Sequence, residues 1–230
     1  MLPADDPAAL SLVGALLAGD VEGLRALLAA HPGLAAERFG DEVQSRTALH
    51  VATDWPGQLP RVAETIAVLV AAGASVDARF AGSHRETALH WAASCDDVAA
   101  IDALLDLGAD IEADGGVLTG GPPLDDAVIF EQWKAARRLV ERGASLALWH
   151  AAALGEIDRL EQLLAAEPGP GPDEVTNAAW HACRAGQLRA AQILAARGAD
   201  LDRTLYDDAS ARQAGLLSGQ PDLVTWLSSS

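Results

Sequence analysis

Short phrases recur along the chain at nearly constant spacing, and this periodicity constrains the fold more than any other feature. Thr47-Ala-Leu-His recurs as Thr87-Ala-Leu-His, and in weaker form as Pro122-Pro-Leu-Asp. A second phrase, Gly-Ala-Ser or Gly-Ala-Asp, begins at positions 73, 108, 143 and 198, the first three of them 35 residues apart. Self-similarity at periods of about 20–50 residues is typical of solenoids, in which each repeat packs only on its neighbours.

A longer phrase extends the pattern to the start of the chain. Residues 19–33 align with residues 155–169 at an offset of 136, which is four periods of 34. Within each repeat, apolar residues recur at helical spacing, as at Ile101, Leu104 and Leu105. A threonine before the first helix can cap it, and a glycine after the second can adopt the left-handed conformation. Each repeat therefore predicts two helices, which need neighbouring repeats to bury their apolar faces.

The period and the phrase Thr-x-Leu-His resemble the ankyrin repeat. The resemblance implies an all-α solenoid of stacked helix-turn-helix repeats joined by hairpin-like fingers, with a concave groove lined by the inner helices. It covers nearly the whole chain, from about Ala8 to Leu227, and implies a single ankyrin-repeat domain over residues 1–230. Seven repeats are expected, the last of them a C-terminal cap: 8–33, 45–79, 85–114, 120–145, 146–169, 176–202 and 206–230.

Repeats 2 and 5 depart from the pattern. Repeat 2 has 23 residues between His50 and Gly73, where repeat 3 has 18 between His90 and Gly108. The extra residues predict a turn-rich excursion that carries Trp55. Repeat 5 ends in a Pro- and Gly-rich linker from residue 167, which either loosens the stack before repeat 6 or simply bridges the two repeats.

Composition excludes several classes of partner. With 33 acidic and 16 basic residues the formal charge is -17, which repels phosphate backbones and anionic lipid headgroups, so neither nucleic acid nor membrane is an expected partner. The N-terminus is acidic where a signal peptide would be basic, and no apolar run reaches the roughly 18–20 residues of a membrane span, which predicts a cytoplasmic protein. Arginine supplies 15 of the 16 basic residues, a bias typical of high-GC bacterial genomes. Two cysteines support no disulfide framework, no local spacing supports a metal site, and no cofactor is expected.

The resemblance also assigns roles to positions on the inner helices. The histidine of Thr-x-Leu-His is expected to hold adjacent repeats together, which makes His50 and His90 structural. Repeats 5 and 6, aligned through Gly155 and Gly186, place Trp149 and Trp180 at this packing position. The next residue of each repeat is expected to face the groove: Val51, Trp91, Asp126, His150, His181 and Ala214.

The first functional interpretation is a binding module that recognises a protein partner along the groove and fingers of repeats 2 to 6, as a monomer with capped ends. The side chains expected to contact the partner are Trp91, Phe130, Arg184, Trp55 and Phe80. The finger of residues 77–85 carries Phe80, His84 and two arginines, and is either a contact for an acidic partner or a solvated loop.

The second interpretation is a small-molecule binder or a cofactor-free enzyme. Asp126, His150 and His181 would form a catalytic row on successive inner helices, because an aspartate can orient a histidine whose pKa near ~6.5 suits proton transfer. Arg184 would hold a carboxylate or an oxyanion. Isomerisation, cyclisation or hydrolysis would suit such an acid–base site, but the first interpretation is the preferred one.

Overall fold

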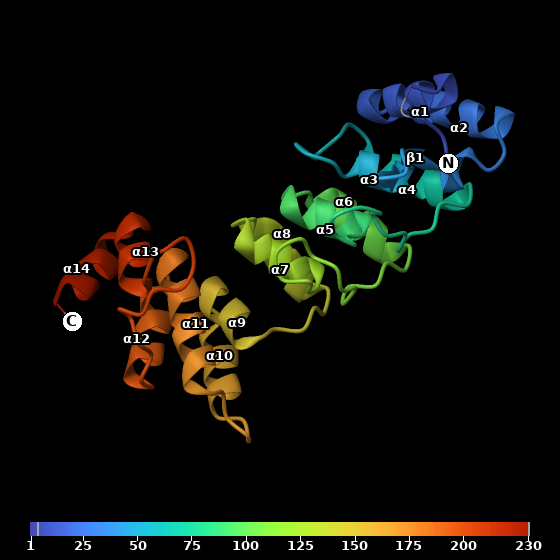
Figure 1. Cartoon of the computed structure of the whole chain (residues 1–230). Helices are drawn as coiled ribbons and strands as arrows, with labels where there is room; N and C mark the ends of the chain where they lie inside the picture. Colours follow the sequence, from blue (N-terminus) through green and yellow to red (C-terminus); the bar gives the residue numbers. More distant parts are fainter. Residues whose placement is uncertain (4, 230) are drawn as a thin grey trace. The chain divides into compact units, whose positions relative to one another are not determined.

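A computed structural model describes residues 1–3 and 5–229. Its helices occur in pairs, and one pair corresponds to each of the seven predicted repeats, although the first helices of repeats 1 and 6 begin before the predicted starts at 8 and 176 (Figure 1). The predicted helix-turn-helix repeats are therefore confirmed. In chain order the pairs are α1 (Pro7–Ala18) with α2 (Val21–Ala30), α3 (Ala48–Ala52) with α4 (Val62–Ala71), α5 (Ala88–Ser94) with α6 (Val98–Asp106), α7 (Pro123–Ile129) with α8 (Trp133–Glu141), α9 (Leu148–Leu154) with α10 (Ile157–Leu164), α11 (Pro172–Arg184) with α12 (Leu188–Ala196), and α13 (Ala211–Leu217) with α14 (Pro221–Ser229).

The chain forms two compact units, Met1–Ala144 with repeats 1 to 4 and Ser145–Ser230 with repeats 5 to 7. Within the second unit α11 packs against α9 on one side and α13 on the other. The linker that starts at residue 167 therefore bridges repeats 5 and 6 and does not interrupt their packing. That all seven repeats form one domain stays a prediction.

A short loop joins the two helices of most repeats. It contains one residue in the left-handed conformation, at Gly19, Asp96, Glu131, Gly155 and Gly186. The next residue can cap the outer helix. In repeats 1 and 3 it is an aspartate, whose carboxylate accepts a hydrogen bond from a first-turn amide (Asp20 from Gly23 at 2.9 Å, Asp97 from Ala100 at 3.0 Å).

Small residues let neighbouring inner helices approach closely. Ala92 and Ala93 of α5 are fully buried, as are Ala151 and Ala152 of α9. The outer helices turn leucine and isoleucine side chains into the same core, among them Ile101. No helix in the described part of the chain is long and apolar enough to cross a membrane.

The first two fingers form short strand pairings. β1 (Arg38–Gly40) and β2 (Ser45–Thr47) form an antiparallel hairpin in which Phe39 lies opposite Arg46. Ser45 forms a further antiparallel bridge with Ala81 of the next finger. This pairing holds the fingers against each other and fixes one side of the hollow described below.

Candidate functional site

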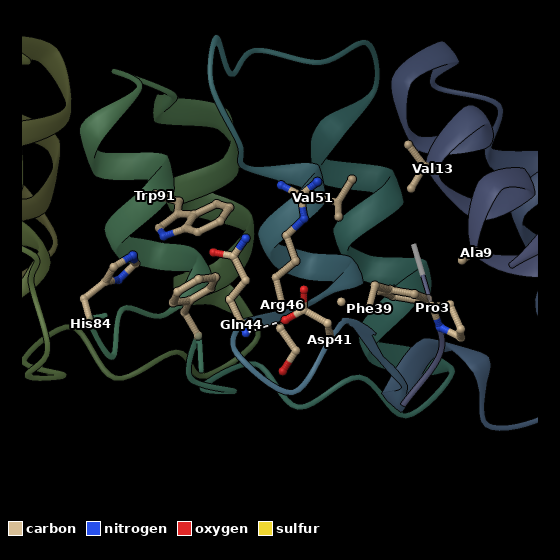
Figure 2. Close-up of a pocket in the computed structure, with 13 residues that line it drawn as sticks. Pro3, Ala9, Val13, Phe39, Asp41, Gln44, Arg46, Val51, His84 and Trp91 are labelled. Atoms are coloured by element: carbon tan, nitrogen blue, oxygen red, sulfur yellow. Dashed lines mark hydrogen bonds between the residues drawn. The ribbon is translucent and has the colours of Figure 1, made fainter. Parts of the chain in front are cut away.

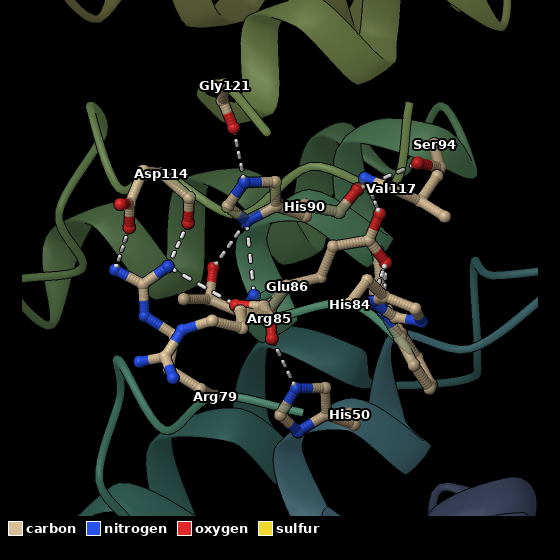
Figure 3. Close-up of polar contacts among 12 residues, drawn as sticks. His50, Arg79, His84, Arg85, Glu86, His90, Ser94, Asp114, Val117 and Gly121 are labelled. Atoms are coloured by element: carbon tan, nitrogen blue, oxygen red, sulfur yellow. Dashed lines mark hydrogen bonds and ion pairs between the residues drawn. The ribbon is translucent and has the colours of Figure 1, made fainter. Parts of the chain in front are cut away.

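Histidines join repeats 2, 3 and 4. The Nδ1 atom of His50 accepts a hydrogen bond from the Thr47 amide at 3.3 Å, so the proton of the neutral ring lies on Nε2, which donates to the Glu86 carbonyl at 3.1 Å (Figure 3). His90 repeats this geometry with the Thr87 amide and the Gly121 carbonyl, each at 3.1 Å. Burial lowers the pKa of His50 to about 4 and also lowers the pKa of His90. Both rings are therefore neutral packing groups.

Trp180 forms the equivalent contact between repeats 6 and 7. Its indole Nε1 donates to the Ala209 carbonyl at 3.1 Å, and its side chain is 2% exposed. Ala209 directly precedes Ser210, the N-cap of α13, as Glu86 precedes the N-cap Thr87. The predicted packing position of Trp180 is confirmed.

His150 corrects the predicted alignment of repeat 5. Its Nδ1 accepts a hydrogen bond from the amide of Ala147, the N-cap residue, at 3.1 Å, and the side chain is 2% exposed. His150 thus has the geometry of His50, where the alignment through Gly155 placed it one residue later, on the groove. The alignment was wrong because the segment from Ala147 to the left-handed Gly155 is one residue shorter than that from Thr87 to Asp96.

Asp126, on α7 of the first unit, is a buried acid. Its side chain is fully buried, and neither carboxylate oxygen has a hydrogen-bond partner within the described residues. Burial, together with the charges of Glu86 and Asp125, raises the pKa of Asp126 to about 8. The carboxyl group therefore keeps a proton at neutral pH.

His181 and Arg184 surround an aromatic cluster of the second unit. The His181 ring centroid lies 4.6 Å from that of Trp149 and 5.1 Å from that of Trp180. The Arg184 guanidinium lies 5.3 Å from the Trp180 ring centroid, and 3.5 Å from the Asp207 carboxylate. The structure thus brings two of the predicted site residues around Trp180, while Asp126 belongs to the other unit. The acid–base row stays a prediction.

The first unit contains a hollow of about 700 Å³. It is bounded by α1, the β1–β2 hairpin, α3, α5 and the finger that follows α4 (Figure 2). Trp91 and Phe80, two of the predicted contact residues, line it together with Val51, which was expected to face the groove. Its other main lining side chains are Val13, Phe39, Asp41, Gln44, Arg46 and His84.

One buried carboxylate holds the aromatic wall of this hollow in place. Glu86 accepts hydrogen bonds from the Trp91 indole and from the Val117 amide, each at 2.8 Å, and its side chain lies 3.1 Å from Nδ1 of His84 (Figure 3). The His84 ring in turn stacks on Phe80 with centroids 4.4 Å apart. Sequence reasoning missed Glu86, because its role depends on a finger amide 31 residues further along the chain.

The finger of residues 77–85 was expected to be either a contact for an acidic partner or a solvated loop. Phe80 and His84 line the hollow, and the Arg79 guanidinium forms an ion pair with Asp114 at 2.9 Å. Arg79 also donates to backbone carbonyls of Arg85 and Asp114. Because Asp114 neutralises Arg79, only one of the two arginines of this finger, Arg85, remains to support the predicted contact with an acidic partner.

The two remaining predicted contacts lie outside the hollow. Trp55 is 82% exposed, on a loop held by a hydrogen bond from the Gln58 amide to the Asp97 carboxylate at 2.6 Å. An ion pair of 2.5 Å between Arg46 and Asp54 connects this loop to the hollow. Phe130, the C-cap residue of α7, is 40% exposed.

No metal centre accompanies these sites in the described residues. Within residues 1–3 and 5–229, no three His, Cys, Asp or Glu side chains are grouped so that they could hold a metal ion.

Comparison with known proteins identifies the architecture. Residues 84–113 match the family model described as "Ankyrin repeat". A crystal structure of the human ASB11 ankyrin repeat domain aligns with a TM-score of 0.58 at 19% sequence identity, over 94% of this chain and 96% of that one. At this identity the likeness shows the fold alone. No curated protein matches the sequence.

Proposed function

Because this is an ankyrin-repeat protein, built on a fold that generally serves as a protein-interaction module, we propose that it binds a protein partner through the hollow of its first compact unit. The observation that carries this proposal is the aromatic hollow of about 700 Å³, lined by Trp91, Phe80 and Phe39. Pockets of about 300–1,000 Å³ accommodate whole small molecules, so the hollow has room for a large side chain of a partner.

The fixed aromatic wall supports the proposal. The Trp91 ring is half-buried, and its indole N–H is already bonded to Glu86, so binding need not order it. A pre-organised side chain loses little conformational entropy when a partner arrives, and buried aromatic anchors dominate many interfaces. Trp55, joined to the hollow through the Arg46–Asp54 ion pair, offers a second exposed aromatic contact nearby.

Selection of a random peptide library on the full-length chain tests the proposal. We expect Trp91→Ala to weaken binding of the selected peptides at least tenfold, about 1.4 kcal/mol, because it removes the centre of the wall. Phe130→Ala is the matched control, since Phe130 is a partly exposed aromatic residue that does not line the hollow. Peptides that bind both variants as well as the parent protein would refute the proposal.

A further inference from the structure

The charged groups at the hollow do not balance one another. Asp41 lines the hollow, and its Oδ1 atom accepts hydrogen bonds from the Val43 and Gln44 amides at 2.8 and 2.9 Å. These bonds lower the pKa of Asp41, so the group is ionised at neutral pH. In the described part of the chain, no Lys, Arg or His side chain forms an ion pair with it.

The basic side chains of the lining already have acidic partners. Arg46 is paired with Asp54 at 2.5 Å, and the His84 ring lies 3.1 Å from the Glu86 carboxylate. The exposed Asp41 carboxylate is thus the uncompensated charge at the edge of an apolar hollow. The net charge of the whole chain, -17, attracts cations to the same surface and repels acidic segments.

We propose that the hollow binds a segment of the partner in which a large apolar side chain stands next to a lysine or arginine. The apolar side chain packs against Trp91, Phe80 and Phe39, and the cation pairs with Asp41. This inference rests on the proposed function and adds the chemical class of the partner to it.

The same peptide selection tests this inference with a second pair of variants. Among clones lost with Trp91→Ala, we expect peptides that carry a large apolar residue with a Lys or Arg within three positions. Asp41→Asn should weaken them about three- to tenfold. The asparagine Oδ1 still accepts the Val43 and Gln44 amides, so the turn is kept while the charge is lost. Glu42→Gln, which removes the neighbouring exposed charge outside the hollow, is the matched control.

A double-mutant cycle assigns the contact. Replacing the peptide's Lys or Arg with Gln should weaken binding to the parent protein as much as Asp41→Asn does, and should have little further effect on the Asp41→Asn variant. Both effects should shrink from 50 to 500 mM salt. Trp91-dependent clones that tolerate Asp41→Asn, or that carry acidic flanks, would overturn the inference and leave the proposed function intact. An absence of Trp91-dependent clones would overturn both.

Discussion

The second unit has an indole at one position where the first unit has imidazoles, although its His150 keeps the geometry of His50. The first unit uses the imidazoles of His50 and His90, whereas repeat 6 of the second unit uses the indole of Trp180. Each ring donates to the carbonyl just before the next inner helix. The position therefore requires a buried ring N–H of suitable reach, and histidine is only one solution. An imidazole can bind a second proton and an indole cannot, so the choice of ring decides whether the contact responds to pH.

The units also differ in the side chain of the residue whose carbonyl accepts the hydrogen bond from the ring. Glu86 accepts a hydrogen bond from His50 at its backbone carbonyl and fixes Trp91 with its side chain. Ala209, whose carbonyl accepts a hydrogen bond from Trp180, has no side chain that could hold an aromatic wall in place. Repeat stacking and the proposed binding surface are therefore coupled through one residue in the first unit.

The largest expected effect is in the second unit. Trp180→Ala should lower the free energy of unfolding by about 3–5 kcal/mol, because it leaves a large cavity and an unpaired carbonyl. Trp180→Phe keeps most of the packing and should cost about 1–3 kcal/mol. Urea denaturation measures both, and hydrogen exchange should place the loss in α11 and α13. A cost below 1 kcal/mol for Trp180→Ala would show that the indole does not join repeats as the imidazoles of His50 and His90 do.

Asp126→Asn should stabilise the first unit. The folded-state pKa of Asp126, about 8, lies above its ordinary value of 3.8, so the folded protein binds the extra proton and loses stability as pH rises between these values. The neutral amide removes this loss, and we expect a gain of up to about 4 kcal/mol at pH 7. Denaturation from pH 5 to 9 checks the slope. An unchanged slope would show that Asp126 is ionised in the folded protein.

Acid should weaken the histidine contacts. The folded-state pKa of His50, about 4, lies below its ordinary 6.5, so stability is lost as pH falls from 6.5 towards 4, by about 2 kcal/mol at pH 5. Asp126 acts in the opposite direction over this range, so the loss is best measured in the Asp126→Asn variant. Hydrogen exchange at pH 7 and pH 5, corrected for the intrinsic rate, should show it in α3. Equal protection at both pH values would contradict the shift.

The smallest effect concerns the outer helices. Asp102 accepts hydrogen bonds from Arg138 and Arg142 at 2.8 and 2.6 Å, which joins α6 to α8. Asp102→Asn should cost about 0.5–1 kcal/mol, less in high salt, because the pairs are partly exposed. In the second unit, Arg197 instead donates to the Leu164 carbonyl at 3.4 Å. Arg197→Gln should cost less still and show little salt dependence; thermal denaturation in 50 and 500 mM salt compares the two.

Periodicity sufficed to predict all seven helix pairs, since each pair is specified by local phrases. It failed where local signals compete. In repeat 6 the helix begins at Pro172, before the predicted start at 176, because proline suits the first helical turn and Glu174 accepts the Gly171 amide at 2.8 Å. In repeat 5 the Gly155 turn and the Ala147 cap give registers that differ by one residue, and only the hydrogen bond of His150 decides between them.

The candidate site was less predictable, because its contacts cross repeats. Trp91 and Phe80 could be named from their types and positions. That Glu86 holds them depends on Val117 in the next finger, and that Arg79 is neutralised depends on Asp114. Such contacts follow from the stacking geometry, which no single repeat specifies.

In each of the hydrogen bonds that join repeats through His50, His90 or Trp180, the ring donates to a carbonyl of the following repeat. Truncation from the two ends of the chain should therefore have different effects. Removing repeats from the C-terminal side takes the acceptor from a ring of His50, His90 or Trp180 and exposes that ring at the new end of the stack. Removing repeats from the N-terminal side only frees a carbonyl at the newly exposed end, where water can take the place of the ring. During synthesis, the ring of each repeat therefore gains its acceptor only after the following repeat has been made. Shortened chains should tolerate loss of their first repeats better than loss of their last.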